Sequence, residues 1–121
     1  MIEFKAVPTF RILDYKTAIT FYVDFLGFSI DWEHRFEPSD PVYMQISNDG
    51  LMLHLSENER FKTGNISFVE SKGIQAFRDK IISRNPENSL SEIQKTDWGT
   101  IQLEIEDPFG NLLRFNEKSN S

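Results

Sequence analysis

Apolar and other residues alternate over several short stretches of the chain, as they do in strands that have one buried face. The first such stretch is Phe4–Ile12, in which Pro8 favours a position at a sheet edge. An Asn-Asp-Gly turn at 48–50 indicates a hairpin between two of the others. The pattern predicts further strands at Phe28–Phe36, Val42–Ser47, Leu51–Ser56, Asn65–Glu70, Ser91–Asp97, Gly99–Glu106 and Asn111–Asn116.

Two stretches show helical spacing instead. In the first, Ile19, Tyr22 and Leu26 fall on one face of a helix. Asp14 can cap its start, and Gly27 can end it. This stretch predicts an amphipathic helix between the first two strands.

The second helical stretch places Ile74, Phe77 and Ile81 on one face. Ser71 can cap its start, and the Asn85–Pro86 pair favours an end there, because the residue before a proline avoids helical geometry. The chain is therefore predicted to run strand–helix–three strands twice, which is an α+β arrangement of two βαβββ modules.

The two halves fit one domain, 1–121, made of modules at about 1–58 and 63–118. The polar stretch 57–64 is the only one with the composition of a linker. Each half has roughly 60 residues, too few to bury much apolar surface alone. We therefore expect the modules to share a sheet surface or to pair between chains.

Along the predicted strands, one set of alternating residues is apolar and the other is mixed. The leucines at 51, 53 and 55 oppose His54, and Leu103 and Ile105 oppose Gln102 and Glu104. One face can pack on the helices while the other stays partly polar. A curved sheet with such a mixed second face predicts a lined cavity.

Composition narrows the class of protein. A net charge of −6 argues against a nucleic-acid partner, because domains that bind nucleic acid usually have a basic face. There is no cysteine, no apolar run long enough to cross a membrane, and no signal-peptide pattern in MIEFKAVPTF. We therefore expect a soluble cytoplasmic protein that binds neither nucleic acid nor membrane.

Three motifs carry a family resemblance: FYVDFLGF at Phe21–Phe28, and DWGT and DPFGN within Asp97–Asn111. With the doubled βαβββ pattern, the chain resembles the glyoxalase/bleomycin-resistance (vicinal oxygen chelate) superfamily over nearly its whole length, and the bleomycin-resistance proteins most of all. The resemblance implies curved mixed sheets that form a ligand groove, and a homodimer. Whether the modules pair within a chain or by exchange between chains is left open.

Metal-dependent members of this superfamily hold a divalent ion with four side chains from the first and fourth strands of each half. The predicted register puts these positions at Val7, His54, Asn65 and Arg114. Only His54 is an ordinary metal ligand, because Val7 has no lone pair, Asn65 is a weak neutral donor and Arg114 is cationic. The sequence therefore predicts no metal site and no cofactor.

Arg114 is the single charge in an apolar strand and stands where metal-dependent relatives carry a carboxylate. It can bind an anionic or carbonyl-rich group of a ligand, or it can pair with Glu104 on the neighbouring strand. Gln102 and His54 are expected on the same polar face. His54 is either a ligand contact or a structural histidine.

The resemblance also places aromatic residues along a groove between subunits, where they clamp the planar part of the antibiotic. Trp98 and Trp32 match these positions, Phe36 is a candidate for a third wall, and Asp31 would supply negative charge for a cationic ligand. For Trp32 and Phe36, ordinary core packing is the alternative.

The predicted function is metal-independent binding and sequestration of a small, cationic, partly planar compound, which is antibiotic resistance of the bleomycin type. One alternative is a glyoxalase-like lyase or isomerase, or another metabolic enzyme of the superfamily without a full metal site, using His54 or Glu104 as general base. Another is a dimer that binds no ligand.

Overall fold

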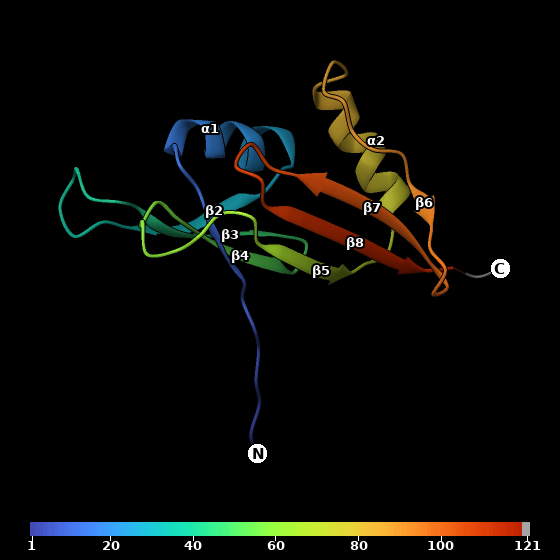
Figure 1. Ribbon diagram of the computed structural model, residues 1–121, viewed down its shortest axis with the longest axis horizontal. Coiled ribbons are helices and arrows are strands. Elements are labelled where there is room, and N and C mark those ends of the chain that lie inside the picture. Colours follow the sequence, from blue (N-terminus) through green and yellow to red (C-terminus); the bar gives the residue numbers. More distant parts are fainter. Residues whose placement is uncertain (120–121) are drawn as a thin grey trace.

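The computed structural model describes residues 1–119, so the last two positions of the predicted domain 1–121 lie outside the described residues. Two four-stranded mixed sheets lie side by side, and the helices pack on the same side of both (Figure 1). The strand orders are β1-β4-β3-β2 and β5-β8-β7-β6, so each module pairs its first strand with its last. These pairs are parallel and the others antiparallel. The predicted pair of βαβββ modules is confirmed.

The strands agree with the alternation pattern in number and order. The first sheet contains β1 (Thr9–Arg11), β2 (Ser29–His34), β3 (Tyr43–Asn48) and β4 (Leu51–Ser56). The second contains β5 (Ile66–Glu70), β6 (Gln94–Lys95), β7 (Thr100–Glu106) and β8 (Leu112–Lys118). Strand β6 is much shorter than the predicted Ser91–Asp97, because only two of its residues pair with β7.

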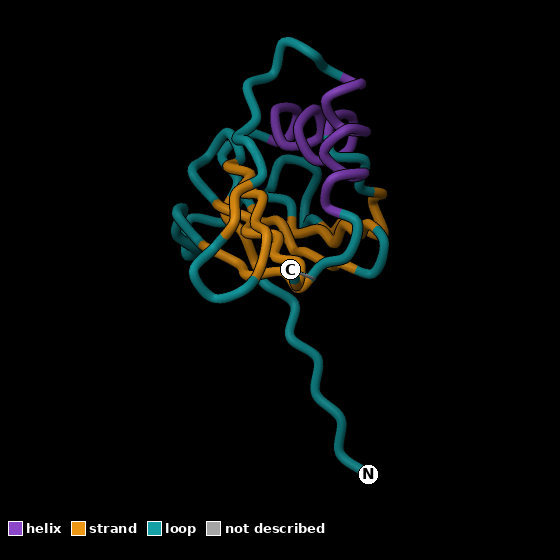
Figure 2. Tube along the Cα trace, turned by 90° about the vertical axis from the view of Figure 1, so that its right-hand side faces the viewer, coloured by secondary structure: helices purple, strands orange, loops and turns teal. Residues whose placement is uncertain are grey.

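The predicted strand Phe4–Ile12 is wrong over its first half. Residues 1–8 form an arm that extends away from the body of the chain (Figures 1 and 2). Pairing with β4 begins where the His54 amide donates to the Pro8 carbonyl, and no strand of the described residues pairs with residues 1–7, although residues 5–8 line a cavity together with parts of β4 and β5. Phe4 is 96% exposed.

The first helix begins as predicted, since the Asp14 carboxylate accepts a hydrogen bond from the Thr17 amide. It starts as α1 (Tyr15–Ile19) and continues as a π-helical segment, η1 (Thr20–Phe25), which the sequence did not predict. Gly27, at φ +89°, follows its end and adopts a conformation that favours glycine.

The predicted cap of the second helix is wrong. Helix α2 (Ile74–Arg84) begins two residues later than a Ser71 cap requires, after Gly73. The Ser71 hydroxyl donates to the Val69 carbonyl, while a Glu117 carboxylate oxygen from β8 accepts from the Ile74 amide, 3.0 Å away. The helix ends before Asn85, as predicted. A carboxylate from another strand therefore takes the role of a local cap.

The core lies between the helices and one face of each sheet. The alternation predicted this face correctly, because Leu53, Leu55, Leu103, Ile105 and Leu113 are all buried. No helix in the described part of the chain is long and apolar enough to cross a membrane.

The DPFGN turn joins the two modules. The Asp107 carboxylate accepts hydrogen bonds from the Tyr22 hydroxyl at 2.6 Å and from the backbone amides of Phe109 and Asn111 at 2.8 Å. The Asn111 side chain donates to Asp107 and to the Arg11 carbonyl of β1. This buried network fixes the turn of the second module against η1 and β1 of the first.

Candidate ligand-binding face

The sheet faces opposite the helices are polar and aromatic, and they carry most of the predicted site residues. We call them the first and second open faces. The first open face comprises Thr9, Asp31, Trp32, Tyr43, Gln45 and His54. The second comprises Phe68, Trp98, Gln102, Glu104, Arg114 and Asn116.

A β-bulge in β2 puts two neighbouring residues on the first open face. The pairing with β3 shifts between Ile30 and Trp32, so Asp31 is the extra residue. The Asp31 carboxylate accepts hydrogen bonds from Gln45 at 3.0 Å and Ser47 at 2.9 Å. In a regular strand Asp31 and Trp32 would point to opposite faces. The bulge therefore places a carboxylate beside an indole.

Trp32 forms part of an aromatic wall. Its ring stacks on Tyr43 with centroids 6.1 Å apart and planes 13° apart, and it meets His54 edge-on at 5.3 Å. The residue is 42% exposed. Trp32 is therefore not a core residue, and one face of this cluster is accessible to a planar ligand.

His54 is the centre of a hydrogen-bonded chain across the first open face. The Asp31 carboxylate can only accept, so the Gln45 amide nitrogen donates to it and the Gln45 amide oxygen accepts from His54 Nε2 at 3.0 Å. His54 Nδ1 then accepts from the Tyr43 hydroxyl at 2.8 Å. Burial lowers the pKa of His54 and favours this neutral form. Both ring nitrogens are thus engaged.

The structure corrects one of the four positions that were matched to the metal ligands of metal-dependent relatives. Thr9 pairs with His54 in the first sheet and Phe68 pairs with Arg114 in the second. The counterpart of Val7, two residues before Thr9, is therefore Ile66 and not Asn65. Asn65 precedes β5, and its side chain donates to the Lys62 carbonyl. The predicted position was wrong by one residue, and a shift of one residue in a strand turns the side chain to the opposite face of the sheet.

The corrected set of positions offers no second metal ligand. Val7 and Ile66 are aliphatic, and Arg114 is cationic. Within residues 1–119, no three His, Asp or Glu side chains are grouped so that they could hold a metal ion.

Arg114 is held by its neighbours on the second open face. Its Nη2 donates to Gln102 at 3.1 Å, and its Nε lies 3.5 Å from a Glu104 carboxylate oxygen. Gln102 also donates to Glu104 at 3.0 Å, and the guanidinium lies 6.0 Å from the Trp98 ring centroid. The pairing with Glu104 is therefore present. It fixes the guanidinium beside an indole that is 57% exposed.

Phe36 lies in the loop after β2 and is 87% exposed. Its ring meets His34 edge-on, with centroids 4.9 Å apart. Neither tryptophan has a ring contact with Phe36 within the described residues. Phe36 is thus neither core nor part of the Trp32 cluster in a single chain.

The predicted site residues form two groups, one on each open face. Of the predicted residues, Asp31, Trp32 and His54 lie together, and so do Trp98, Gln102, Glu104 and Arg114. Neither of two cavities in the described chain, one beside α2 and one beside residues 5–8, is lined by any of them. The structure therefore does not bring the two groups together in one pocket.

Sequence reasoning missed Thr9, Tyr43 and Gln45, which link or stack on the predicted residues of the first open face. Their positions in alternating strands could have revealed them, since Thr9 and Gln45 pair with His54, and Tyr43 lies two residues from Gln45 in the same strand. Nothing in the local sequence predicts the bulge at Asp31.

Comparison with known families gives a match over the whole chain. A family model described as glyoxalase superfamily protein matches residues 1–121. No curated protein is significantly similar to the chain in sequence.

Solved structures share the fold at low sequence identity. A bleomycin-binding protein from Streptomyces verticillus, complexed with copper(II)-bleomycin, has a TM-score of 0.72 and 20% identity over the full length of both chains. A bleomycin resistance determinant encoded on the transposon Tn5 has a TM-score of 0.77 and 18% identity, covering 96% of this chain and 98% of that one. A glyoxalase-related enzyme from Clostridium phytofermentans has a TM-score of 0.77 and 20% identity, with 98% and 97% covered. At such identities the likeness shows a common fold alone.

Proposed function

The chain belongs to the glyoxalase superfamily, and from that premise we propose that it binds and sequesters a small, cationic, partly planar compound without using a metal ion. The observation that carries this proposal is the bulge that sets the Asp31 carboxylate beside the half-exposed Trp32 ring. A planar group can stack on the indole while a nearby cation interacts with Asp31.

The electrostatics of the whole chain suit such a ligand. A net charge of −6 attracts cations over a screening length of about 8 Å at physiological ionic strength. The Asp31 carboxylate lies at the surface, where its two hydrogen bonds come from the neutral side chains of Gln45 and Ser47.

The complete groove is proposed to form between two copies of the chain. In this arrangement the first open face of one subunit lies opposite the second open face of its partner, so that the ligand contacts Trp32 from one chain and Trp98 from the other. The wide exposure of both indoles supports a further covering surface. The extended arm, with its exposed Met1, Ile2 and Phe4, supports exchange of residues 1–8 between subunits.

Bleomycin-type glycopeptides are the first candidate ligands, because bleomycin-binding proteins share the fold. The biological role would then be antibiotic resistance by sequestration in the cytoplasm. Catalysis of the lyase or isomerase type is the rival proposal. It draws support from the glyoxalase-related enzyme of the same fold, but a general base at His54 would first have to break its bond with Tyr43.

Titration with bleomycin tests the binding proposal, with tryptophan fluorescence and melting temperature as the two readouts. We expect quenching that saturates and a rise in melting temperature. Trp98→Ala should weaken binding by about 1–3 kcal/mol, the scale of losing one stacked aromatic platform. His54→Ala should have a smaller effect. If millimolar bleomycin changes neither signal, the bleomycin assignment is wrong and the ligand must be a different compound.

A further inference from the structure

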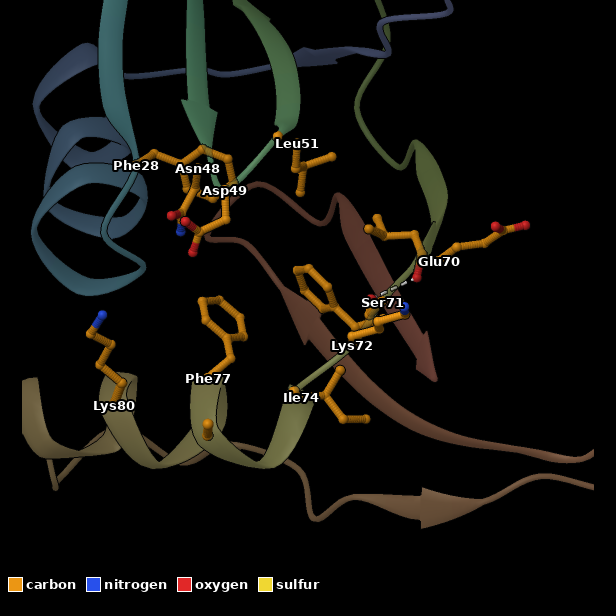
Figure 3. A pocket seen from close by; sticks show the side chains of 15 residues that line it. Phe28, Asn48, Asp49, Leu51, Glu70, Ser71, Lys72, Ile74, Phe77 and Lys80 are labelled. Atoms are coloured by element: carbon orange, nitrogen blue, oxygen red, sulfur yellow. Dashed lines mark hydrogen bonds between the residues drawn. The ribbon is translucent and has the colours of Figure 1, made fainter. Parts of the chain in front are cut away.

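The cavity beside α2 lies on the helix side of the sheets, where the two modules meet (Figure 3). Its volume is about 560 Å³, and it is lined by the β3–β4 turn, the end of β5 and helix α2. This volume lies within the range of small-molecule sites. None of the residues of the two open faces lines it. Any ligand bound here would therefore occupy a site separate from the proposed groove.

The floor of the cavity is apolar. Phe28, Ile74 and Phe115 are buried side chains that still line it. The apolar lining residues are Phe28, Leu51, Val69, Ile74, Ala76, Phe77 and Phe115. Three of these are phenylalanines, which suit an aromatic or branched aliphatic group.

One end of the cavity mouth carries an acidic and a basic side chain, which come from different modules. Asp49 lies in the β3–β4 turn, where its φ of 49° and the φ of 89° at Gly50 are typical of a tight hairpin turn. Lys80 lies on α2. In Figure 3 the Asp49 carboxylate points toward α2 and the Lys80 ammonium points up from it. Within residues 1–119 neither side chain forms a hydrogen bond or an ion pair.

These charges restrict the ligand. A simple anion at this end would meet Asp49, and a simple cation would meet Lys80, so each would be attracted by one group and repelled by the other. A compound that carries both signs on neighbouring atoms satisfies both groups. We propose that this cavity binds a small zwitterion with an apolar body, of the class of an α-amino acid with an aromatic or branched side chain. Its ammonium group faces Asp49, its carboxylate faces Lys80, and its side chain contacts Phe28 and Phe77.

The experiment uses three probes of one size. L-phenylalanine carries both charges, phenethylamine only the cation and 3-phenylpropionate only the anion. Binding is followed in the full chain by the backbone amide signals of Gly50 and Gly73, which line the cavity, with the Trp98 indole signal as reporter of the second open face. We expect L-phenylalanine to shift both glycine signals, leave Trp98 unchanged, and bind about threefold or more tightly than either single-charge probe.

Conservative variants separate the two charges. Asp49→Asn is compatible with the turn, because asparagine tolerates positive φ, and Lys80→Gln keeps a good helix former. Asp49→Asn should weaken phenylalanine and phenethylamine by about threefold, and it should strengthen phenylpropionate because it removes a repulsion. Lys80→Gln should weaken phenylalanine and phenylpropionate, and it should strengthen phenethylamine because it removes a repulsion. The matched control is Lys72→Gln, which removes a cation from the lining residues on the Ser71 side and should change nothing.

Several results would overturn the proposal. One is no movement of Gly50 and Gly73 with L-phenylalanine at tens of millimolar. Another is equal affinity for all three probes with no effect of Asp49→Asn or Lys80→Gln, since the cavity would then bind only an apolar group. A response confined to Trp98 would place the binding on the second open face instead. Failure of bleomycin binding would leave this proposal intact, because the two sites share no residues.

Discussion

The hydroxyl of Tyr22 donates a hydrogen bond of 2.6 Å to the carboxylate of Asp107, and both residues are buried. Burial, followed by the nearby carboxylate, raises the pKa of Tyr22 far above its ordinary value, so the hydroxyl keeps its proton. This bond joins the helix of the first module to the DPFGN turn of the second. The motif that marks the family is thus a structural link between modules.

Replacement of this tyrosine should therefore destabilise the whole chain. Tyr22→Phe leaves a buried carboxylate with one donor fewer, and should lower the free energy of unfolding by about 1.5–3 kcal/mol. Tyr15→Phe is the matched control, because its hydroxyl donates to Glu33 at the surface and its loss should cost no more than about 0.5 kcal/mol. Urea unfolding measures both. Equal effects of the two substitutions would contradict the structural role of the Tyr22–Asp107 bond.

Gly27 should be less replaceable than other glycines of similar geometry. A Cβ at Gly27 would lie 2.8 Å from Nη1 of Arg84, which donates to the Phe25 carbonyl and ties α2 to η1. Gly64 has nearly the same φ but open space around it. Both alanine substitutions should lower the free energy of unfolding by about 1–2 kcal/mol, because alanine disfavours the left-handed backbone conformation. Gly27→Ala should lower it by about 1 kcal/mol more.

The excess cost should disappear when Arg84 is absent. In an Arg84→Ala background, Gly27→Ala and Gly64→Ala should lower the free energy of unfolding by similar amounts. A persistent difference would show that Gly27 is required for a reason other than the approach of Arg84.

Stability should depend on pH through His54. Because burial lowers its pKa in the folded chain, the unfolded chain binds this proton more readily. The stabilising contribution is present above about pH 6.5, the ordinary histidine pKa, and is lost as the pH falls toward the folded value. His54→Gln should therefore reduce the loss of unfolding free energy between neutral and mildly acidic pH. NMR titration of the wild-type ring should give a pKa below 6.5, and a higher value would refute the prediction.

Asp31 should contribute charge to ligand binding, and a neighbouring carboxylate should not. Asp31→Asn is expected to weaken bleomycin binding by up to about fivefold at low salt, with a smaller effect at high salt. Glu33→Gln is the control, because Glu33 accepts from Tyr15 on the helix side of the sheet. If both variants bind alike, the carboxylate at the bulge is not part of the binding surface.

Regular alternation and helix caps formed by a nearby residue were predictable from the sequence. Caps formed by a residue far away along the chain were not. Asp14 caps its helix through a bond to Thr17, which lies three residues away, so the sequence pattern was sufficient. At α2 the acceptor is Glu117, 43 residues away from Ile74, and the local candidate Ser71 turned out not to be the cap. A contact between residues so far apart in the chain forms only when the strand and the helix are packed together, so the local sequence does not predict it.

The same distinction holds for the candidate site. Alternation placed His54, Gln102, Glu104 and Arg114 on the open faces, because a period of two is fixed by strand geometry. It failed at Asn65, where a one-residue error in the start of the strand reversed the face. It could not place Asp31 beside Trp32, since a bulge breaks the period that the prediction uses.

The central claim is that each binding groove takes Trp32 from one subunit and Trp98 from the other. Calorimetric titration of bleomycin into an equal mixture of Trp32→Ala and Trp98→Ala, after the subunits have exchanged, tests it most directly. Each variant alone should have lost tight binding, and random pairing should restore about a quarter of the grooves, because each mixed dimer regains one intact groove of its two. Tight sites at about that fraction are the predicted result. No recovery on mixing, while wild-type chains bind tightly, would contradict the shared groove, and no tight binding by the wild type would contradict bleomycin as the ligand.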